Sequence, residues 1–149
     1  MKLMGGEWVA VPLEGGHWSI DLIARVSRGG VLLGYFFGPR SERKPDLNDI
    51  DGLKPDDAVL IGLIGHLGIK NQTWPVIGRT GNFVRKDWPL PLFVRRDSLI
   101  DRVELVRYSD DDLSEVQARR VDSRDVAGLP EDGLMGHLFV EERLSDLLA

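Results

Sequence analysis

The densest group of side chains able to do chemistry is a run of carboxylates in the second half of the chain. Asp110, Asp111, Asp112 and Glu115 place four acidic groups within six residues. Such a run can bind a divalent cation or a basic protein surface. No glycine-turned loop or distal glutamate completes a calcium motif around it, so no metal site is predicted. A solvated turn is the ordinary interpretation, and a contact surface for a basic partner is the functional one.

The other reactive side chains do not form a catalytic set. The segment Gly62–Gly68 follows an apolar run, but it lacks the Gly-Lys-Ser/Thr ending of a phosphate-binding loop. No Gly-x-Ser-x-Gly elbow is present, and Asp56–Asp57 follows a proline as a turn does. The three histidines show no helical pairing and lie at His17, His66 and His137. We therefore predict no catalytic residue, no cofactor and no enzymatic activity.

Composition and charge narrow the classes of protein further. The 149 residues include no cysteine, which excludes disulfides and thiolate catalysis. No stretch approaches the roughly 18 apolar residues of a membrane span, and the N-terminus lacks the apolar core of a signal peptide, so a cytoplasmic protein is expected. The net charge of −5 argues against a dedicated nucleic-acid binder. Residues 1–96 carry +3 and residues 97–149 carry −8, which suggests an acidic surface or a well-solvated C-terminal region.

A strand through residues 31–37 is expected at the centre of the fold. The run from Gly30 to Pro39 is almost wholly apolar and is bounded by Gly29-Gly30 and Gly38-Pro39. A buried helix is the alternative, but Gly34 and three consecutive aromatic residues favour a strand. Such a strand would be covered on both faces.

The two strands before it are expected to form an antiparallel meander with it. Residues 8–12 form a short apolar run, and residues 18–27 alternate between apolar and polar side chains with period two. Because the connections are short and rich in glycine, consecutive strands must run antiparallel. We expect the alternating strand to bury only its apolar face. Four aromatic positions should be largely buried: Trp8, Trp18, Phe36 or Phe37, and Trp74.

The rest of the chain predicts further strands and two helices. Asp46 is placed to cap a short helix near residues 46–51, and residues 58–64 form a second buried strand. Two Trp-Pro pairs, at residues 74–75 and 88–89, are each expected to begin an edge strand or cross the end of a barrel. Residues 102–108 should be a half-exposed strand, and residues 113–121 a strand or a helix. Val140, Leu144, Leu147 and Leu148 have the spacing of a C-terminal amphipathic helix.

Together these patterns predict a mostly β protein, built as a strongly bent antiparallel sheet or a small SH3-like barrel. No linker divides the sequence, so residues 1–149 are expected to form one domain. Its β core would span residues 7–94. Residues 97–149 would form an acidic C-terminal extension, packed on or beside that core.

Three segments carry a resemblance to a known family. They are Glu7-Trp8-Val9-Ala10-Val11-Pro12-Leu13, Gly34-Tyr35-Phe36-Phe37-Gly38-Pro39 and Trp74-Pro75-Val76-Ile77-Gly78. In this order and spacing the sequence resembles the Immunity protein 26 family of bacterial polymorphic toxin systems, over roughly residues 7–94. The resemblance implies a mostly β protein that neutralises a toxin from kin or rival bacteria by binding it.

The resemblance and the charge distribution give one functional hypothesis. A basic toxin, such as a nuclease-type domain, would be met by the acidic C-terminal region. Asp110, Asp111, Asp112 and Glu115 are the candidate contact residues for this partner. One alternative is a small β-barrel module that binds a peptide or nucleic acid, for which exposed aromatic residues beside the pairs Arg85-Lys86 and Arg95-Arg96 would be the sign. The other is an enzyme whose site is assembled from scattered residues.

Overall fold

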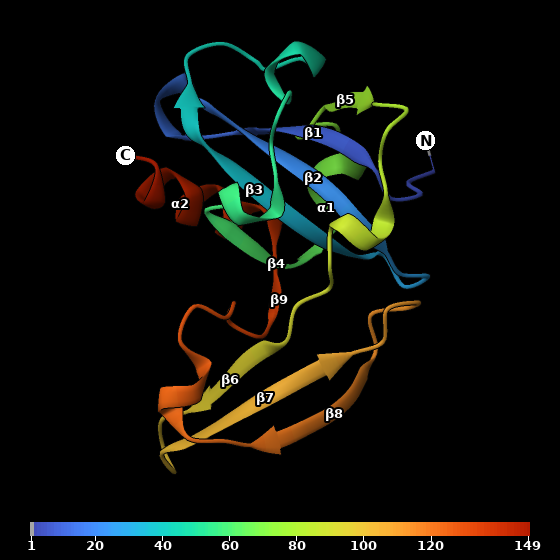
Figure 1. Cartoon of the computed structure of the whole chain (residues 1–149). Helices are drawn as coiled ribbons and strands as arrows, with labels where there is room; N and C mark the ends of the chain where they lie inside the picture. Colours follow the sequence, from blue (N-terminus) through green and yellow to red (C-terminus); the bar gives the residue numbers. More distant parts are fainter. Residues whose placement is uncertain (1) are drawn as a thin grey trace.

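The computed structural model describes residues 2–149, and its strands form two sheets (Figure 1). The strands are β1 (Glu7–Pro12), β2 (Trp18–Val26), β3 (Val31–Ser41), β4 (Leu60–Gly65), β5 (Val76–Arg79), β6 (Phe93–Asp97), β7 (Arg102–Tyr108), β8 (Glu115–Arg120) and β9 (Leu134–Met135). The helices are α1 (Leu67–Lys70) and α2 (His137–Leu147). No helix within residues 2–149 combines the length and apolarity needed to span a membrane.

The larger sheet has the strand order β5-β1-β2-β3-β4-β9, and the smaller has the order β6-β7-β8. All neighbours in the larger sheet are antiparallel except β4 and β9, which run parallel. The sheet is not closed into a barrel. The predicted mostly β fold is therefore confirmed, in its bent-sheet form.

The first three strands form the predicted antiparallel meander, with β3 between β2 and β4. The turn from β2 to β3 is closed by the Ser27 backbone N–H, which donates to the Val31 carbonyl at 2.8 Å. Gly30 has a φ of +85° in this turn, a conformation that costs glycine little and other residues more. The glycine pair read from the sequence as a breaker therefore sets the tight connection.

Both faces of β2 are buried, which corrects the expectation that only its apolar face lies in the core. Asp21 is fully buried between Val9 of β1 and Phe36 of β3. A β-bulge between Ile23 and Arg25 shifts the alternation, so that Arg25 pairs with Leu33. A bulge redirects side chains in this way. It turns Arg25 away from the face that contains Asp21.

Two glycines make room on that same face. Gly34 of β3 and Gly62 of β4 are cross-strand partners. A Cβ on Gly34 would lie 2.8 Å from the Phe36 ring and 2.9 Å from the Asp21 carboxylate, and a Cβ on Gly62 would lie 2.2 Å from the Met135 methyl. Neither position can accept a side chain without displacing a neighbour. The glycines inside the two apolar runs thus allow neighbouring side chains to pack directly against the backbone of β3 and β4.

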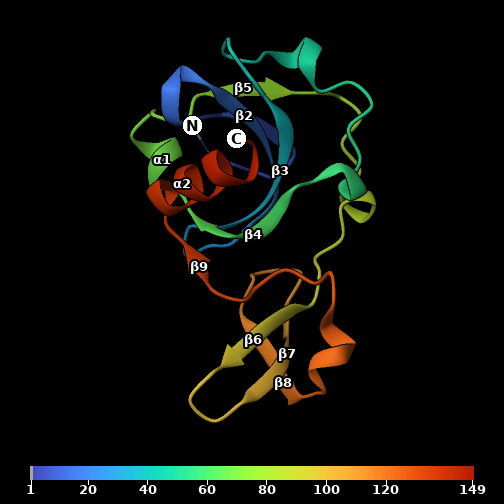
Figure 2. The ribbon, with the colours of Figure 1, turned by 90° about the vertical axis from the view of Figure 1, so that its left-hand side faces the viewer.

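The concave face of the larger sheet curls around α2 (Figure 2). Val140 and Leu144 of α2 are fully buried there against Trp74, whose indole Nε1 donates to the Glu141 carboxylate at 2.8 Å. The predicted C-terminal helix is therefore confirmed. Its apolar positions complete one of the two large clusters of the core.

The opposite face is covered by an aromatic cluster centred on Trp88. Its ring centroid lies 6.1 Å from that of Trp8, 5.2 Å from that of Tyr35 and 6.0 Å from that of Phe37. The Tyr35 hydroxyl donates to the Pro89 carbonyl, and burial raises the pKa of Tyr35 to about 12. The segment around the second Trp-Pro pair therefore closes this face of the sheet, before β6 begins.

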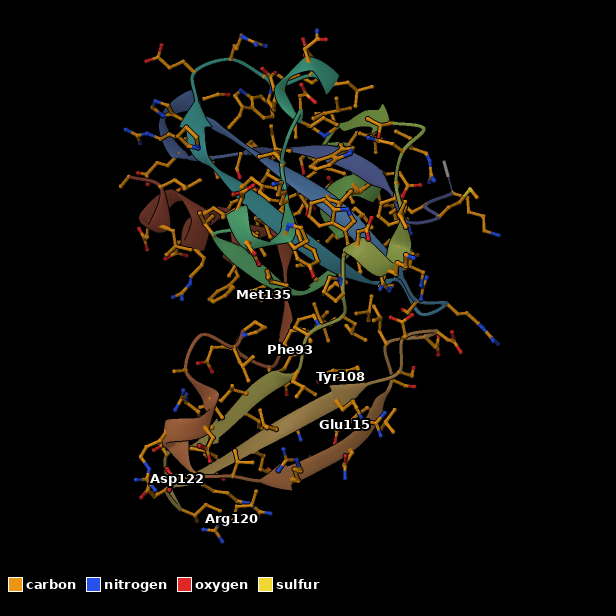
Figure 3. The ribbon with its side chains drawn as sticks, viewed as in Figure 1. Phe93, Tyr108, Glu115, Arg120, Asp122 and Met135 are labelled. Atoms are coloured by element: carbon orange, nitrogen blue, oxygen red, sulfur yellow. The ribbon has the colours of Figure 1, made fainter. Side chains whose placement is uncertain are left out.

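The smaller sheet joins the larger one through this same cluster. Phe93 of β6 and Val106 of β7 are fully buried in it. The Phe93 and Tyr108 rings meet at a centroid distance of 5.5 Å, and Figure 3 shows both between the two sheets. The shared cluster favours one domain over residues 1–149, a division that stays a prediction.

The short helix, the edge strands and the burial of the aromatic residues follow the predictions, except at Trp18. The short helix near residues 46–51 is one turn of 3-10 helix at Leu47–Asp49, capped by the Asp46 side chain. β5 follows the first Trp-Pro pair and is an edge strand, as predicted, and the segment 113–121 contains a strand, β8. Trp8, Phe36, Phe37 and Trp74 are buried, but Trp18 is only half-buried, because it begins β2 at the end of the sheet.

Candidate partner-binding surface

Glu115 of the acidic run predicted as a partner site begins β8, and residues 110–112 lie in the turn between β7 and β8. At its start, Asp110 accepts a hydrogen bond from Arg25 Nε and another from Arg85 Nη2, each at 2.9 Å. The Arg25 side chain is only 3% exposed. Partial burial alone would raise the pKa of Asp110, but the hydrogen bonds and charges of Arg85 and Arg25 outweigh it and hold that pKa below its usual value.

Two more of the four predicted residues are also engaged within the chain. Asp112 accepts the backbone N–H of Arg28 at 3.1 Å, which ties the turn to the β2–β3 connection. Glu115 pairs with Arg95 at 2.5 Å, and the same guanidinium reaches Asp132 at 3.0 Å. Asp111 is exposed and has no polar partner among residues 2–149. The acidic turn therefore connects the two sheets, and Asp111 is the one of the four residues whose carboxylate has neither a hydrogen-bond nor an ion-pair partner among residues 2–149.

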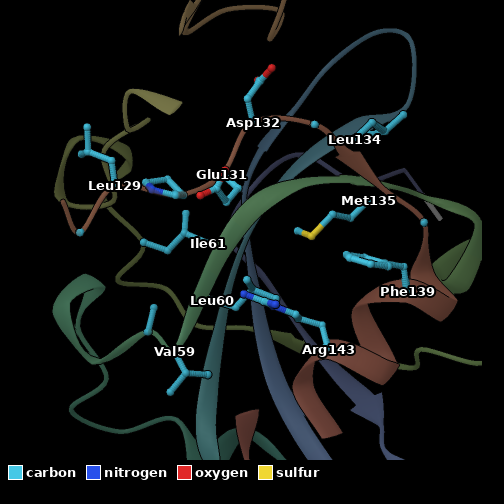
Figure 4. A pocket seen from close by; sticks show the side chains of 15 residues that line it. Val59, Leu60, Ile61, Leu129, Glu131, Asp132, Leu134, Met135, Phe139 and Arg143 are labelled. Carbon is cyan, nitrogen blue, oxygen red and sulfur yellow. The ribbon is translucent and has the colours of Figure 1, made fainter. Parts of the chain in front are cut away.

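A second surface feature, which the sequence did not predict, is an apolar groove of 760 Å³ beside β4 (Figure 4). One wall is the chain from Ala58 to Ile61, the other is the segment 128–136, and α2 forms the end. Three large apolar side chains of the groove are exposed, namely Val59, Leu134 (63%) and Phe139 (56%). Exposed apolar residues gathered in a concave surface are typical of protein interaction sites.

The groove exists because segment 130–132 leaves the edge of β4. β9 pairs with β4 only at Leu63 and Ile64. Just before β9, the chain pairs with β6 instead: the Val94 N–H donates to the Pro130 carbonyl at 2.9 Å, and the Asp132 N–H donates to the Val94 carbonyl at 2.8 Å. The edge of β4 at Leu60 and Ile61 is therefore left without a strand neighbour in the described chain.

The charged groups around the groove differ in whether they are already paired. Glu131 pairs with Arg96 at 3.3 Å, and Asp132 pairs with Arg95 and accepts the Tyr108 hydroxyl. Arg143, in contrast, forms no ion pair with any residue of 2–149. Figure 4 shows its side chain extending from α2 toward Leu60. Among the charged side chains that line the groove, Arg143 is therefore the one without an ion-pair partner in residues 2–149.

The residues considered for catalysis do not come together. His17 and His66 each contact a nearby backbone carbonyl, of Glu14 and Gly30, and His137 lies against Trp74. Within residues 2–149 no three His, Asp or Glu side chains are grouped as metal ligands would be. The surface features that stand out in the described chain are the apolar groove and the acidic turn.

Sequence reasoning missed the groove because its walls are far apart in the chain. Glycine and proline make residues 126–136 resemble a loop in the sequence, and the strand they contain, β9, has only two residues. The sequence did contain one signal for the groove, the apolar pairs Leu134-Met135 and Leu138-Phe139. A solvated loop followed by a helix with one buried face would contain fewer apolar residues than these.

The comparisons with known proteins give one match. The model of the family described as Immunity protein 26 matches residues 5–103, about two-thirds of the chain. No curated protein and no solved structure matches the chain. The matched part contains β1 to β6, including the β4 wall of the groove. The acidic turn, β9 and α2 lie beyond it.

Proposed function

This chain belongs to the Immunity protein 26 family, and on that premise we propose that it binds a cognate bacterial toxin and neutralises it without catalysis. The proposal places the protein in the cytoplasm, where it would meet a toxin that has entered the cell. A binding protein of this kind needs a rigid scaffold and a complementary surface. The two buried clusters on opposite faces of the larger sheet provide the scaffold.

The observation that carries the proposal is the exposed apolar groove. Protein interfaces are enriched in aromatic residues, methionine and arginine at their centres, and the groove presents Phe139, Met135 and Arg143 within one concavity. Burying Phe139 and Leu134 would supply the apolar contact that holds a complex together. We assign the groove as the main contact with the toxin.

The acidic turn has a second role in the proposal. We propose that the partner is a basic, nuclease-type toxin domain, drawn toward Asp110, Asp111, Asp112 and Glu115. Paired arginines reduce the negative potential around Asp110 and Glu115, and Asp112 accepts a hydrogen bond from a backbone N–H. Asp111 therefore contributes most directly to the attraction of a basic partner. Charges at the rim of an interface act mainly on the association rate.

One alternative to toxin binding is a small β module that binds nucleic acid or a peptide. Stacking of bases requires exposed aromatic rings beside basic side chains. Trp88 is 8% exposed and Phe93 is fully buried, and Phe83 is half-buried and packs against the core cluster, so the rings near the two basic pairs are engaged in the core. This burial, together with the net charge of −5, favours a protein partner over nucleic acid.

Co-expression with the toxin encoded beside this gene tests the proposal. The toxin should arrest growth when expressed alone, and growth should recover when this chain is present. A tagged chain should also retain the toxin on an affinity column, and the washed complex should contain intact toxin. Degraded or modified toxin would indicate catalysis. Failure both to rescue growth and to retain the toxin would contradict the proposed function.

A further inference from the structure

We propose that the groove binds an extended segment of the toxin as an added strand on the free edge of β4, with a carboxylate of that segment paired to Arg143. This inference rests on the proposed function and names the kind of segment that the groove accepts. In addition to apolar contact, the bound segment would form main-chain hydrogen bonds with β4 and one ion pair with Arg143.

Strand addition requires an open strand edge, and β4 has one. β9 runs parallel to β4 and pairs at Leu63 and Ile64. If the chain before β9 stayed straight, residues 131 and 132 would lie beside Leu60 and Ile61. Instead this segment pairs with Val94 of β6, so the edge of β4 is open where the groove lies. Unpaired edges are templates for another strand, and peptide-binding domains use them in this way.

The side chains beside the open edge of β4 are apolar on both faces of the sheet. An added strand points successive side chains to opposite sides of the sheet. Leu60 packs against the concave cluster and Ile61 against the cluster on the other face, so apolar side chains flank the open edge on both sides. The groove volume of 760 Å³ is within the range of sites that hold small ligands, and it suits a few residues rather than a long strand. A short segment with aliphatic side chains fits this surface.

The charged side chains of the groove favour an acidic group in the bound segment. Glu131 pairs with Arg96, and Asp132 shares Arg95 with Glu115, whereas Arg143 has no acidic partner among residues 2–149. A guanidinium binds a carboxylate with two directed hydrogen bonds. We therefore expect the bound segment to carry an aspartate or a glutamate opposite Arg143. A basic segment would be repelled there, even if the toxin as a whole is basic.

Synthetic peptides test this without the toxin. The peptide acetyl-Thr-Val-Asp-Val-Thr-Val-amide is titrated into the ¹⁵N-labelled full chain, followed by NMR, beside the same peptide with Asn in place of Asp. We expect amide shifts at Leu60, Ile61 and Phe139, and about tenfold tighter binding of the Asp peptide. Arg143→Gln should remove this preference. Arg40→Gln, at an exposed arginine without an ion pair, should keep it.

Two peptides N-methylated at alternate residues, in opposite registers, test the main-chain pairing. Only one register removes the donors that face β4, so one peptide should lose binding and the other should keep it. Equal binding of both would overturn strand addition. Shifts confined to other surfaces, or none at millimolar peptide, would overturn the site, and an Asp preference that survives Arg143→Gln would overturn the charged contact.

The toxin itself separates this inference from the proposed function. If the co-expressed toxin is retained by the wild type and equally by Phe139→Glu and Arg143→Glu, the function holds and the groove is not its site. If those two variants lose the toxin while Arg40→Gln keeps it, the groove is supported. If the wild type itself fails to retain the toxin, the proposed function fails, and the peptide titrations still decide whether the groove accepts an extended acidic segment.

Discussion

The Nε of Arg25 donates a 2.9 Å hydrogen bond to the carboxylate of Asp110, which lies 85 residues further along the chain. The arginine is buried in the larger sheet and the aspartate is 55% exposed at a turn of the smaller one. Arg85 reaches the same carboxylate from the segment that joins the sheets. One carboxylate therefore neutralises a buried cation and fixes three parts of the chain together.

We expect Asp110→Ala to lower the free energy of unfolding by about 1–3 kcal/mol, because it leaves the buried Arg25 without its acidic partner. Urea denaturation at neutral pH measures this. Asp111→Ala is the matched control, one residue away and without an intramolecular partner, and it should leave stability nearly unchanged. Equal effects of the two substitutions would mean that the Arg25 contact adds nothing to the fold.

Asp111→Asn should slow association with a basic toxin by about twofold at low salt, since a rim charge steers the encounter. The difference should shrink as salt is added, because the Debye length falls to about 3 Å at 1 M. Stopped-flow binding at several salt concentrations is the measurement. An unchanged association rate at low salt would leave the acidic turn with its structural role alone.

Trp74→Ala should cost about 3–5 kcal/mol, because Trp74 is 1% exposed and holds α2 against the concave face. The substitution also removes the donor that Glu141 accepts. Trp18→Ala is the comparison, since that ring is only half-buried, and it should cost distinctly less. Thermal or urea unfolding of both variants measures the difference. If the Trp74→Ala variant unfolds with the wild-type midpoint, α2 is not held by this ring.

The meander could be predicted because its information is local. Period-two alternation, apolar runs and glycine-rich turns fix β1, β2 and β3 within short stretches of sequence. The capped turn at Asp46 was predictable for the same reason. The bulge before Arg25 was not, because a bulge changes the register without changing the local pattern.

The surfaces were harder to predict because they depend on contacts between distant segments. Four acidic residues within six positions look available for a partner, but the arginines that pair with Asp110 and Glu115 come from positions 25, 85 and 95. The groove forms because segment 130–132 pairs with β6 and not with β4. Hydrophobic patterning does not determine which of these two strand edges the segment pairs with.

The buried Asp21 allows the effect of its ionisation on stability to be measured separately from the effect of its packing in the core. Its carboxylate is fully buried on the face covered by α2, and neither oxygen has a hydrogen-bond partner among the described residues. Burial raises the pKa of Asp21 well above its usual value, and the nearby Tyr35 backbone N–H offsets this only in part without reaching bonding geometry.

The sign of the resulting pH dependence follows from proton linkage. Below about pH 4, Asp21 is protonated in both the folded and the unfolded chain and has no effect on stability. As the pH rises toward the elevated pKa, the unfolded chain loses this proton and the folded chain keeps it. Folding then weakens by up to about 1.4 kcal/mol per pH unit from this group.

Asp21→Asn keeps the shape and removes the titration, so it should be close to wild type in stability at pH 4 and more stable at pH 7. Urea unfolding of both proteins from pH 4 to pH 7 gives the difference between them. That difference removes the opposite contributions of Asp49, Asp110 and Asp122, whose pKa values are lowered in the folded chain and which both proteins share. A difference that stays constant with pH would show that Asp21 ionises in the folded protein as readily as in the unfolded one, which its burial beside Val9 and Phe36 argues against.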